Sequence, residues 1–388
     1  MNTREPAIIK SILDNDDYKF KMGQVVFHDF PEAVVTYEFT NRGQTPFPEG
    51  FADAVLWQIE MMATLALTYE EYLYLQTIPG MRLSYIEWLM SFRFDPGDVV
   101  VQQEGSVLRV SIKGKWFRTI FWEVPLMAII SELFFKLTGK TPSIDTNSRI
   151  IAKAKKLSEA GCLWADFGTR RRFDFKVQDA VCHLMKGTKG FLGTSNVYLA
   201  MKHGIKPIGT SAHEMVMGIS AKYGATMANR AWNMHWSNHY QGLNGIALTD
   251  TFTTDVFLRD WDSYYARLFD GVRQDSGDPS EWGEKMLDHY KKLGIDTHNK
   301  TFVFSDGLDP DTFIRLTRQF CLMVKVVGGI GTNLSNDCGH KPLNMVIKLK
   351  TADFGQGPIE VVKLSDNTGK HGGNAEAIAR VKGELRIV

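Results

Sequence analysis

Polar and small residues that could do chemistry recur at the ends of short apolar runs in the second half of the chain. The run ends lie at 164–169, 191–195, 208–213, 247–250, 272–277, 302–307 and 326–332. A single such end is an ordinary turn. A series of them indicates one shared site, because the loops after parallel strands open onto the same face of a sheet.

His213 is the candidate nucleophile among the ten histidines. It stands at a run end, after the small residues 209–212 and before Glu214. Neutral imidazole is nucleophilic at physiological pH, and a neighbouring carboxylate such as Glu214 can orient the ring. His235 and His239 are four residues apart on one expected helix, without an acid at metal-ligand spacing, so we interpret them as packing or surface residues.

The segment 273–279 places Arg273 beside Asp275. Carboxylates accept hydrogen bonds from a sugar diol or hold Mg²⁺ through oxygen. Asp250 and Asp306, at other run ends, would join this acidic side of the site. Asp278 followed by Pro279 is typical of a helix start, with the aspartate as N-cap.

Phe167 comes shortly before Arg170, Arg171 and Arg172. An aromatic face stacks on a flat heterocycle, while arginine pairs with a carboxylate or a phosphate. Three adjacent arginines cannot all face one site. We expect Arg170 to point inward, one of the other two to lie near phosphate and the remaining one to form a structural ion pair.

A glycine-rich segment follows the last apolar run, with Gly329, Gly331 and Thr332. Glycines let backbone N–H groups converge on an anion, and Thr332 adds a hydroxyl. The segment matches neither the Walker nor the dinucleotide-binding spacing. It predicts a phosphate cradle, with a plain tight turn as the alternative.

Alternating strands and helices must position these residues. From about residue 149 the pattern predicts parallel strands with helical crossovers, and therefore a β/α barrel with its site at the carboxyl ends of the strands. Before that, 18–27 and 68–92 have helical spacing, 34–40 reads as a strand, and 99–103 with 107–112 predicts a hairpin. We expect an α+β domain over 1–140, joined by the C-terminal segment 342–388, and a barrel over 141–341.

Composition limits the class of protein. The 388 residues carry a formal net charge of +1, which argues against a nucleic-acid or membrane-surface binder. The four cysteines form no CxxC pair, and the N-terminus has no apolar stretch for a signal peptide, so we expect a cytoplasmic protein. The longest apolar run, 119–137, is interrupted by acids and a proline and predicts a buried helix rather than a membrane span.

The ordered motifs resemble those of nicotinate phosphoribosyltransferases. The opening residues 14–22 are similar to the family's Asp-x-Tyr-Lys-x-x-Met pattern, and five further motifs follow in family order, at 166–172, 193–196, 209–214, 275–279 and 304–309. The resemblance covers nearly the whole chain. It implies an irregular, incomplete β/α barrel with an N-terminal α+β domain, usually in a homodimer.

The resemblance also implies a reaction. Nicotinate and phosphoribosyl pyrophosphate (PRPP) would give nicotinate mononucleotide and pyrophosphate, with Mg²⁺, and with ATP hydrolysed through a phosphohistidine at His213. Phe167 and a Tyr18 from the partner subunit would sandwich the pyridine ring, while Arg170 would pair with its carboxylate. Asp275 would contact ribose, and Gly329, Gly331 and Thr332 would take the 5′-phosphate. The other residues expected to bind substrate are Ser195, Thr210, Arg273 and Asp306.

Ser195 bears on the choice of substrate. Nicotinamide-using relatives carry an aspartate at its place, which would repel a carboxylate, so a neutral serine favours nicotinate. A nicotinamide- or quinolinate-using enzyme is the alternative. A non-catalytic nucleotide-binding barrel is the alternative from another class of protein.

Overall fold

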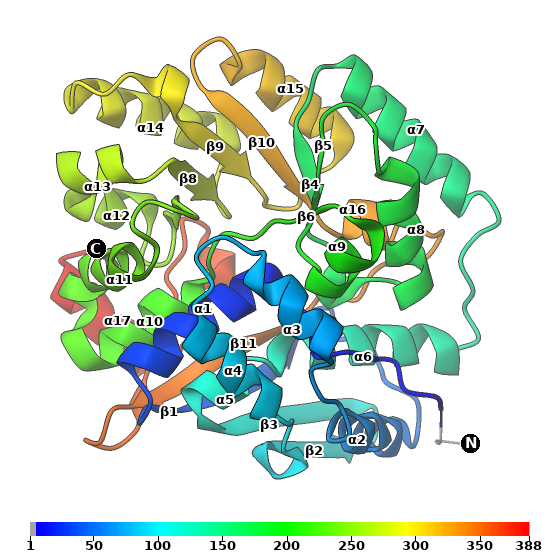
Figure 1. Ribbon diagram of the computed structural model, residues 1–388. Helices are drawn as coiled ribbons and strands as arrows, with labels where there is room; N and C mark the ends of the chain where they lie inside the picture. Colours follow the sequence, from blue (N-terminus) through cyan, green and yellow to red (C-terminus); the bar gives the residue numbers. More distant parts are fainter. Residues whose placement is uncertain (1–4, 388) are drawn as a thin grey trace.

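The computed structural model describes residues 5–387 and contains two sheets, shown in the upper and lower parts of Figure 1. The upper sheet is parallel, in the order β6-β5-β4-β10-β9-β8-β7. Its strands are β4 (Trp164–Asp166), β5 (Phe191–Thr194), β6 (Lys206–Pro207), β7 (Ile246–Leu248), β8 (Gly271–Gln274), β9 (Thr301–Phe304) and β10 (Lys325–Ile330). Within 5–387, the edge strands β6 and β7 do not pair with each other, so the barrel is incomplete. The predicted α/β class and open barrel are confirmed.

Helices connect and cover these parallel strands, as crossover connections require. They are α7 (Thr146–Glu159), α8 (Phe175–Met185), α9 (Val197–His203), α10 (His213–Tyr223), α11 (Ala225–Tyr240), α12 (Thr254–Asp260), α13 (Ser263–Leu268), α14 (Pro279–Lys292), α15 (Pro310–Phe320) and α16 (Thr332–Ser335), with the 3₁₀ turns η2 (Thr169–Arg171) and η3 (Thr297–Asn299). Asp278 accepts hydrogen bonds from the N–H groups of Ser280 and Glu281, at 2.8 and 2.9 Å, directly before Pro279. The predicted N-cap is confirmed.

The lower sheet is antiparallel, in the order β12-β11-β1-β3-β2. Its strands are β1 (Val34–Asn41), β2 (Val99–Glu104), β3 (Val107–Lys115), β11 (Met345–Asp353) and β12 (Ile359–Glu360). The predicted hairpin is β2–β3, and its side chains alternate as a one-sided sheet requires, with Leu108, Val110 and Ile112 buried. β11 pairs with β1 from Val34 opposite Asp353 to Asn41 opposite Met345, so the C-terminal segment returns to the N-terminal sheet as predicted.

Helices of the N-terminal part pack around this sheet and against the barrel. They are α1 (Asp17–Asp29), α2 (Phe51–Met62), α3 (Tyr69–Gln76), α4 (Leu83–Ser91), the 3₁₀ turn η1 (Pro96–Asp98), α5 (Trp116–Thr119) and α6 (Glu123–Leu137); the 3₁₀ turn η4 (Thr368–Lys370) and α17 (Ala375–Leu385) end the chain. The expected apolar helix is α6, which is buried along nearly its whole length and contacts both β11 and η2. The predicted boundary near residue 140 falls in the loop between α6 and α7.

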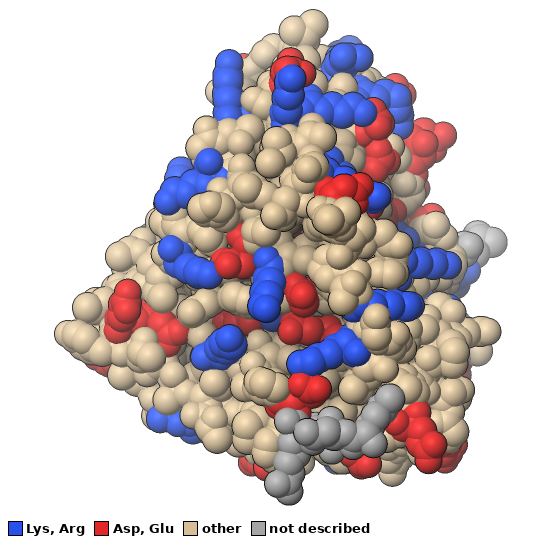
Figure 2. All heavy atoms as spheres, turned by 90° about the vertical axis from the view of Figure 1, so that its right-hand side faces the viewer, with Lys and Arg blue, Asp and Glu red and all other residues tan. Residues whose placement is uncertain are grey.

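The surface has no single dominant charge on the face seen in Figure 2, where basic and acidic side chains are interspersed. Among the described residues, no helix has the length and apolar character needed to span a membrane.

Candidate active site

A cavity of about 120 Å³ lies at the carboxyl ends of the barrel strands. Most of the predicted site residues line it: Tyr18, Phe167, Arg170, Ser195, Thr210, His213, Arg273, Asp275, Gly329, Gly331 and Thr332. They come from α1 and from loops after five different strands, because these strands are parallel and their ends meet at one edge.

His213 is the first residue of α10, and both of its ring nitrogens have partners. Nδ1 lies 3.1 Å from Thr251 Oγ1, while Nε2 lies 3.1 Å from Asp275 Oδ2 and 2.8 Å from Lys363 Nζ. Burial, reinforced by the positive charge of Lys363, lowers the pKa of His213. The neutral, nucleophilic form of the imidazole is therefore favoured.

Glu214 does not orient the His213 ring, which corrects the sequence prediction. Its carboxylate points away from the cavity and binds Lys19 of α1, the Tyr37 hydroxyl and, at 2.8 Å, the Trp116 indole N–H. Asp275 and Thr251 are the partners of the ring instead. Glu214 fixes the start of α10 to α1, β1 and α5, so it acts on His213 only through the position of the helix.

Two aspartates stand beside His213. Asp275 accepts a hydrogen bond from Ser305 Oγ at 2.9 Å. Although burial acts in the opposite direction, Arg273, His213 and Lys363 together hold the pKa of Asp275 well below its usual range. Asp250 is buried; its Oδ2 accepts from Ser276 Oγ at 2.5 Å, whereas its Oδ1 has no hydrogen-bond partner.

These groups fit a divalent cation. One ligand atom from each of His213, Asp250 and Asp275 lies within 4.8 Å of the other two. Two carboxylates, one with an unsatisfied buried oxygen, are the hard oxygen donors that Mg²⁺ prefers. Asp306 is not among the residues that line the cavity, because its carboxylate binds Lys370 at the rim.

The three adjacent arginines separate as expected. Arg172 is fully buried and pairs bidentately with Asp14, at 2.7 and 2.9 Å, which makes it the structural ion pair. Arg170 and Arg171 both line the cavity. Of Arg171 and Arg172, only Arg171 borders the cavity, and its contact with a phosphate stays a prediction.

Phe167 and the glycine segment are packed against each other. A Cβ at Gly329 would lie 2.4 Å from Phe167 Cδ2, so only glycine allows the ring to occupy this place. The Phe167 N–H donates to the Ile330 carbonyl at 2.8 Å, which joins β4 to the end of β10. The glycine segment that we expect to bind phosphate thus also forms one wall of the pocket around the Phe167 ring.

Tyr18 lines the cavity of its own chain, together with Phe167. Its backbone is close to the barrel because Asp17 N–H donates to the Ser195 carbonyl at 2.7 Å. In the single chain Tyr18 is therefore already part of the cavity, while a Tyr18 supplied by a partner subunit stays a prediction. The homodimer itself stays a prediction.

Ser195 is not a free hydroxyl. It donates to Asp16 Oδ1 at 2.6 Å, so the wall at this position carries a carboxyl group supplied from another part of the chain. A carboxyl group is therefore present at this position although its serine is neutral. Thr210 also has a partner, since Arg273 donates to its hydroxyl at 2.5 Å.

Cations that the sequence did not reveal approach from the C-terminal segment. Lys363 lies 3.6 Å from Asp250 Oδ2 in addition to its contact with His213, and Lys370 binds Asp306. A two-way backbone bridge between Lys363 and Gly372 closes the segment into a loop. Burial, with the positive charges of Arg42, Lys363 and Lys370, lowers the pKa of Lys348 to about 7. The sequence carries little signal for these cations, since Lys348 lies inside a strand and Lys363 and Lys370 are scattered among ordinary loop residues.

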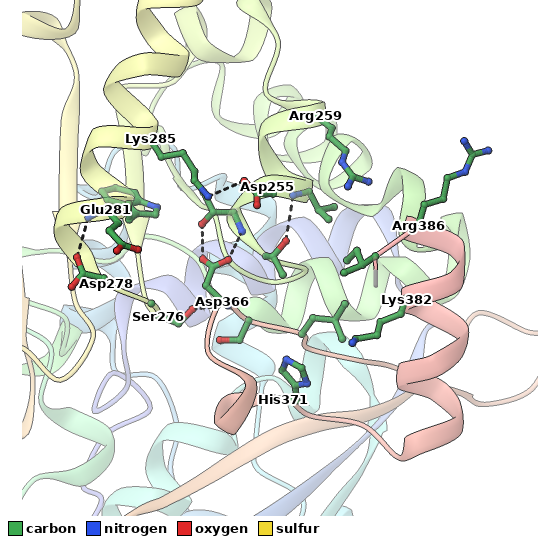
Figure 3. Close-up of a pocket in the computed structure, with 18 residues that line it drawn as sticks. Asp255, Arg259, Ser276, Asp278, Glu281, Lys285, Asp366, His371, Lys382 and Arg386 are labelled. Atoms are coloured by element: carbon green, nitrogen blue, oxygen red, sulfur yellow. Dashed lines mark hydrogen bonds and ion pairs between the residues drawn. The ribbon is translucent and has the colours of Figure 1, made fainter.

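A larger cavity of about 630 Å³ lies between α12, α14 and α17 (Figure 3). It contains none of the predicted catalytic or substrate-binding residues. Two of its acids have partners: Asp255 pairs with Lys285 at 2.9 Å, and Asp366 accepts from the Thr254 N–H at 2.8 Å. The smaller cavity, where the predicted residues converge, is the candidate active site.

Comparisons with known proteins agree with this site. The model of the nicotinate phosphoribosyltransferase (NAPRTase) family matches residues 162–387, and that of the family's N-terminal domain matches 13–131. A nicotinate phosphoribosyltransferase of Desulforapulum autotrophicum is 48% identical over 381 residues, covering 96% of this chain and 97% of the relative. One of Methanosarcina acetivorans is 42% identical over 394 residues, covering 96% of each.

Solved structures give the same result. The nicotinate phosphoribosyltransferase of Porphyromonas gingivalis superposes with a TM-score of 0.95 at 39% identity, covering 98% of this chain and all of the other. That of Vibrio cholerae superposes with a TM-score of 0.92 at 35% identity, covering 100% of this chain and 96% of the other. In sequence and in fold, this chain belongs to the nicotinate phosphoribosyltransferase family.

Proposed function

We propose that this chain transfers the phosphoribosyl group of PRPP to the ring nitrogen of nicotinate, the first step of NAD salvage from nicotinate. The observation that carries the proposal is a single cavity that joins an aromatic wall, an inward arginine, an ionised aspartate and a neutral histidine: Phe167, Arg170, Asp275 and His213. The names of the relatives favour nicotinate over nicotinamide and quinolinate.

Different residues of the cavity bind the pyridine ring, the ribose and the 5′-phosphate. Phe167 and Tyr18 hold the pyridine ring, and Arg170 pairs with its carboxylate, so that the ring nitrogen is directed at the ribose anomeric carbon. Asp275 accepts from the ribose diol, while the segment with Gly329, Gly331 and Thr332 receives the 5′-phosphate.

The bond changes follow from this placement. The ring nitrogen forms a bond to the anomeric carbon as the bond from that carbon to the pyrophosphate oxygen breaks. Positive charge develops on the sugar and negative charge on the leaving group. Arg171, Lys363 and Lys370 stand where they can stabilise that leaving group. Mg²⁺ bound with the substrate phosphates, near Asp250 and Asp275, would neutralise part of their charge.

ATP coupling is part of the proposal. His213 Nε2 attacks the terminal phosphorus of ATP, the bond to the ADP oxygen breaks, and water later releases phosphate from the histidine. Lys363, 2.8 Å from Nε2, is placed to neutralise the phosphorylated ring. The cysteine pattern supports a cytoplasmic location, and the family resemblance supports a homodimer.

A product assay tests the function directly. The protein is incubated with PRPP and Mg²⁺, with or without ATP, and with nicotinate, nicotinamide or quinolinate. Nicotinate mononucleotide should form from nicotinate, and faster with ATP. Preferential turnover of nicotinamide or quinolinate, or no product with any of the three, would reject the proposal.

His213→Asn should abolish stimulation by ATP while leaving some uncoupled transfer, because only the phosphorylated residue is lost. Acid-labile labelling by ATP carrying an isotope in its terminal phosphate measures the step. His298→Asn, at an exposed histidine outside the cavity, is the matched control and should keep the label. Wild-type labelling of the His213→Asn variant would show that another residue carries the phosphate.

A further inference from the structure

Asp16 lines the same cavity as Phe167 and Arg170, the residues proposed to hold the pyridine ring. Asp16 is 2% exposed and directly precedes α1, but its side chain does not cap that helix. Its backbone forms a bridge with Asn196, and its Oδ1 accepts from Ser195 Oγ at 2.6 Å. A buried carboxyl group that neither caps a helix nor forms an ion pair is available to a ligand.

The groups that face Asp16 are already balanced without it. From η2 comes Arg170, and from α6 comes Glu123, which lies 3.4 Å from Arg170 and 2.6 Å from Lys19 of α1. Lys19 also binds Glu214 of α10. Two cations thus face two carboxylates. Tyr18 and, across Arg170, Asp275 of the loop after β8 complete the titratable groups.

An acidic substrate disturbs this balance. When its carboxylate pairs with Arg170, an ionised Asp16 leaves two uncompensated negative charges in a buried site, and a protonated Asp16 leaves one. Burial raises the pKa of Asp16, and the opposing effect of Arg170 weakens once that arginine serves the substrate. Like charges at close range in low dielectric favour uptake of a proton by one of them.

We propose that Asp16 takes up one proton when nicotinate binds and then donates a hydrogen bond to the substrate carboxylate, while Ser195 Oγ holds its other oxygen. Asp16 is thereby a specificity-determining residue, because its carboxyl group is uncharged when the bound substrate is an acid. Ionised, it would instead accept from the amide of nicotinamide. The inference rests on the proposed function and describes how the same site distinguishes a carboxylate from an amide at position 3 of the pyridine ring.

Proton uptake makes binding depend on pH in a defined direction. Above the pKa of free Asp16, each pH unit should weaken nicotinate binding by up to about tenfold, because one proton must be supplied. Nicotinamide needs no proton, so its weaker binding should not change in this way. The ratio of the two affinities should therefore fall as pH rises.

The experiment is isothermal titration of the full chain with nicotinate at pH 7.5, in two buffers of different ionisation enthalpy, together with the KM for nicotinate from pH 6 to 8.5. We expect uptake of about one proton for the wild type and none for Asp16→Asn, whose KM should be independent of pH. Ser195→Ala removes a hydrogen bond that favours the ionised form, so it should move the rise in KM to higher pH.

Asp53→Asn, at an exposed acid on α2, is the matched control and should keep both the uptake and the slope. Equal uptake in Asp16→Asn and wild type, or none in wild type, would overturn the assignment. If Asp16→Asn fails to fold, Ser195→Ala still decides, because its rise in KM should occur at higher pH than that of the wild type. Loss of nicotinate turnover by the wild type would be a failure of the proposed function, whereas turnover without proton linkage would be a failure of this inference alone.

Discussion

At the scale of single residues, arginines of one short segment lie in different environments. Arg172 is held in the core by Asp14, while Arg170, with 45% of its side chain exposed, borders the cavity. Charge alone does not distinguish them. What distinguishes them is that η2 turns the chain at this point, so that successive side chains leave it in different directions.

Arg170→Ala should raise the KM for nicotinate by roughly tenfold to a hundredfold, because a charge-assisted hydrogen bond contributes about 1.5–3 kcal/mol. The effect on nicotinamide should be much smaller, since its amide carries no charge. Steady-state kinetics with both substrates measures the difference. Arg318→Ala, at an exposed arginine on α15, is the control; equal losses for both substrates would show that Arg170 does not read the carboxylate.

At the scale of elements, contacts between helices hold the site's loops in place. Glu132 of α6 accepts the N–H of Phe175 at the start of α8, at 3.0 Å. Burial, together with the negative charges of Asp174 and Asp14 and despite Arg172, raises the pKa of Glu132 to about 7. The contact between Glu132 and Phe175 forms a junction between α6 and α8. This junction lies directly after the arginine segment, so its stability affects the position of η2.

The pH dependence of this junction has a defined sign. The native state holds a proton on Glu132 that the unfolded chain releases near its ordinary pKa of 4.5. Its contribution to stability is therefore complete below pH 4.5 and is lost as pH rises to about 7. The loss is about 2 kcal/mol, since the carboxyl group keeps some contact with water.

Glu132→Gln mimics the protonated acid and keeps an acceptor for Phe175. Its gain in unfolding free energy over wild type should grow from pH 5 to pH 8 and reach about 2 kcal/mol. Urea unfolding at both pH values measures it, with Glu159→Gln on the surface of α7 as control. A gain that is independent of pH would contradict the assigned titration.

At the scale of the whole molecule, segments far apart in the sequence meet at the cavity. The N-terminal α1 and the barrel strands with their following loops line it, and β11 carries the end of the chain back across β1, so that Lys363 contacts His213 beside the cavity.

Mixing inactive variants tests this arrangement. Tyr18→Ala and Asp275→Ala should each be nearly inactive, and mixtures after reversible dissociation should show no recovery, since every chain keeps its own defect. Activity of the mixture is compared with that of the two parents. Recovery toward about a quarter of wild-type activity would instead show a shared site, because half of the dimers would then carry one intact site of two.

The sequence by itself determined which segments carry chemistry and which elements hold them. Apolar runs ending in small and polar residues predicted the parallel strands, and the Asp278-Pro279 pair predicted a helix start, because these signals are local. The order of the motifs was enough to indicate the family, and His213 as the nucleophile stays a prediction.

Only the tertiary structure decided which groups meet. Asp16 contacts Ser195, Lys363 contacts His213, and Glu214 turns to Lys19, over separations of 150 residues or more. No local pattern encodes such pairs, since they depend on how the two sheets and the helices between them pack. The balance of charge in the active site, and with it the state in which Asp16 meets a substrate, follows from that packing.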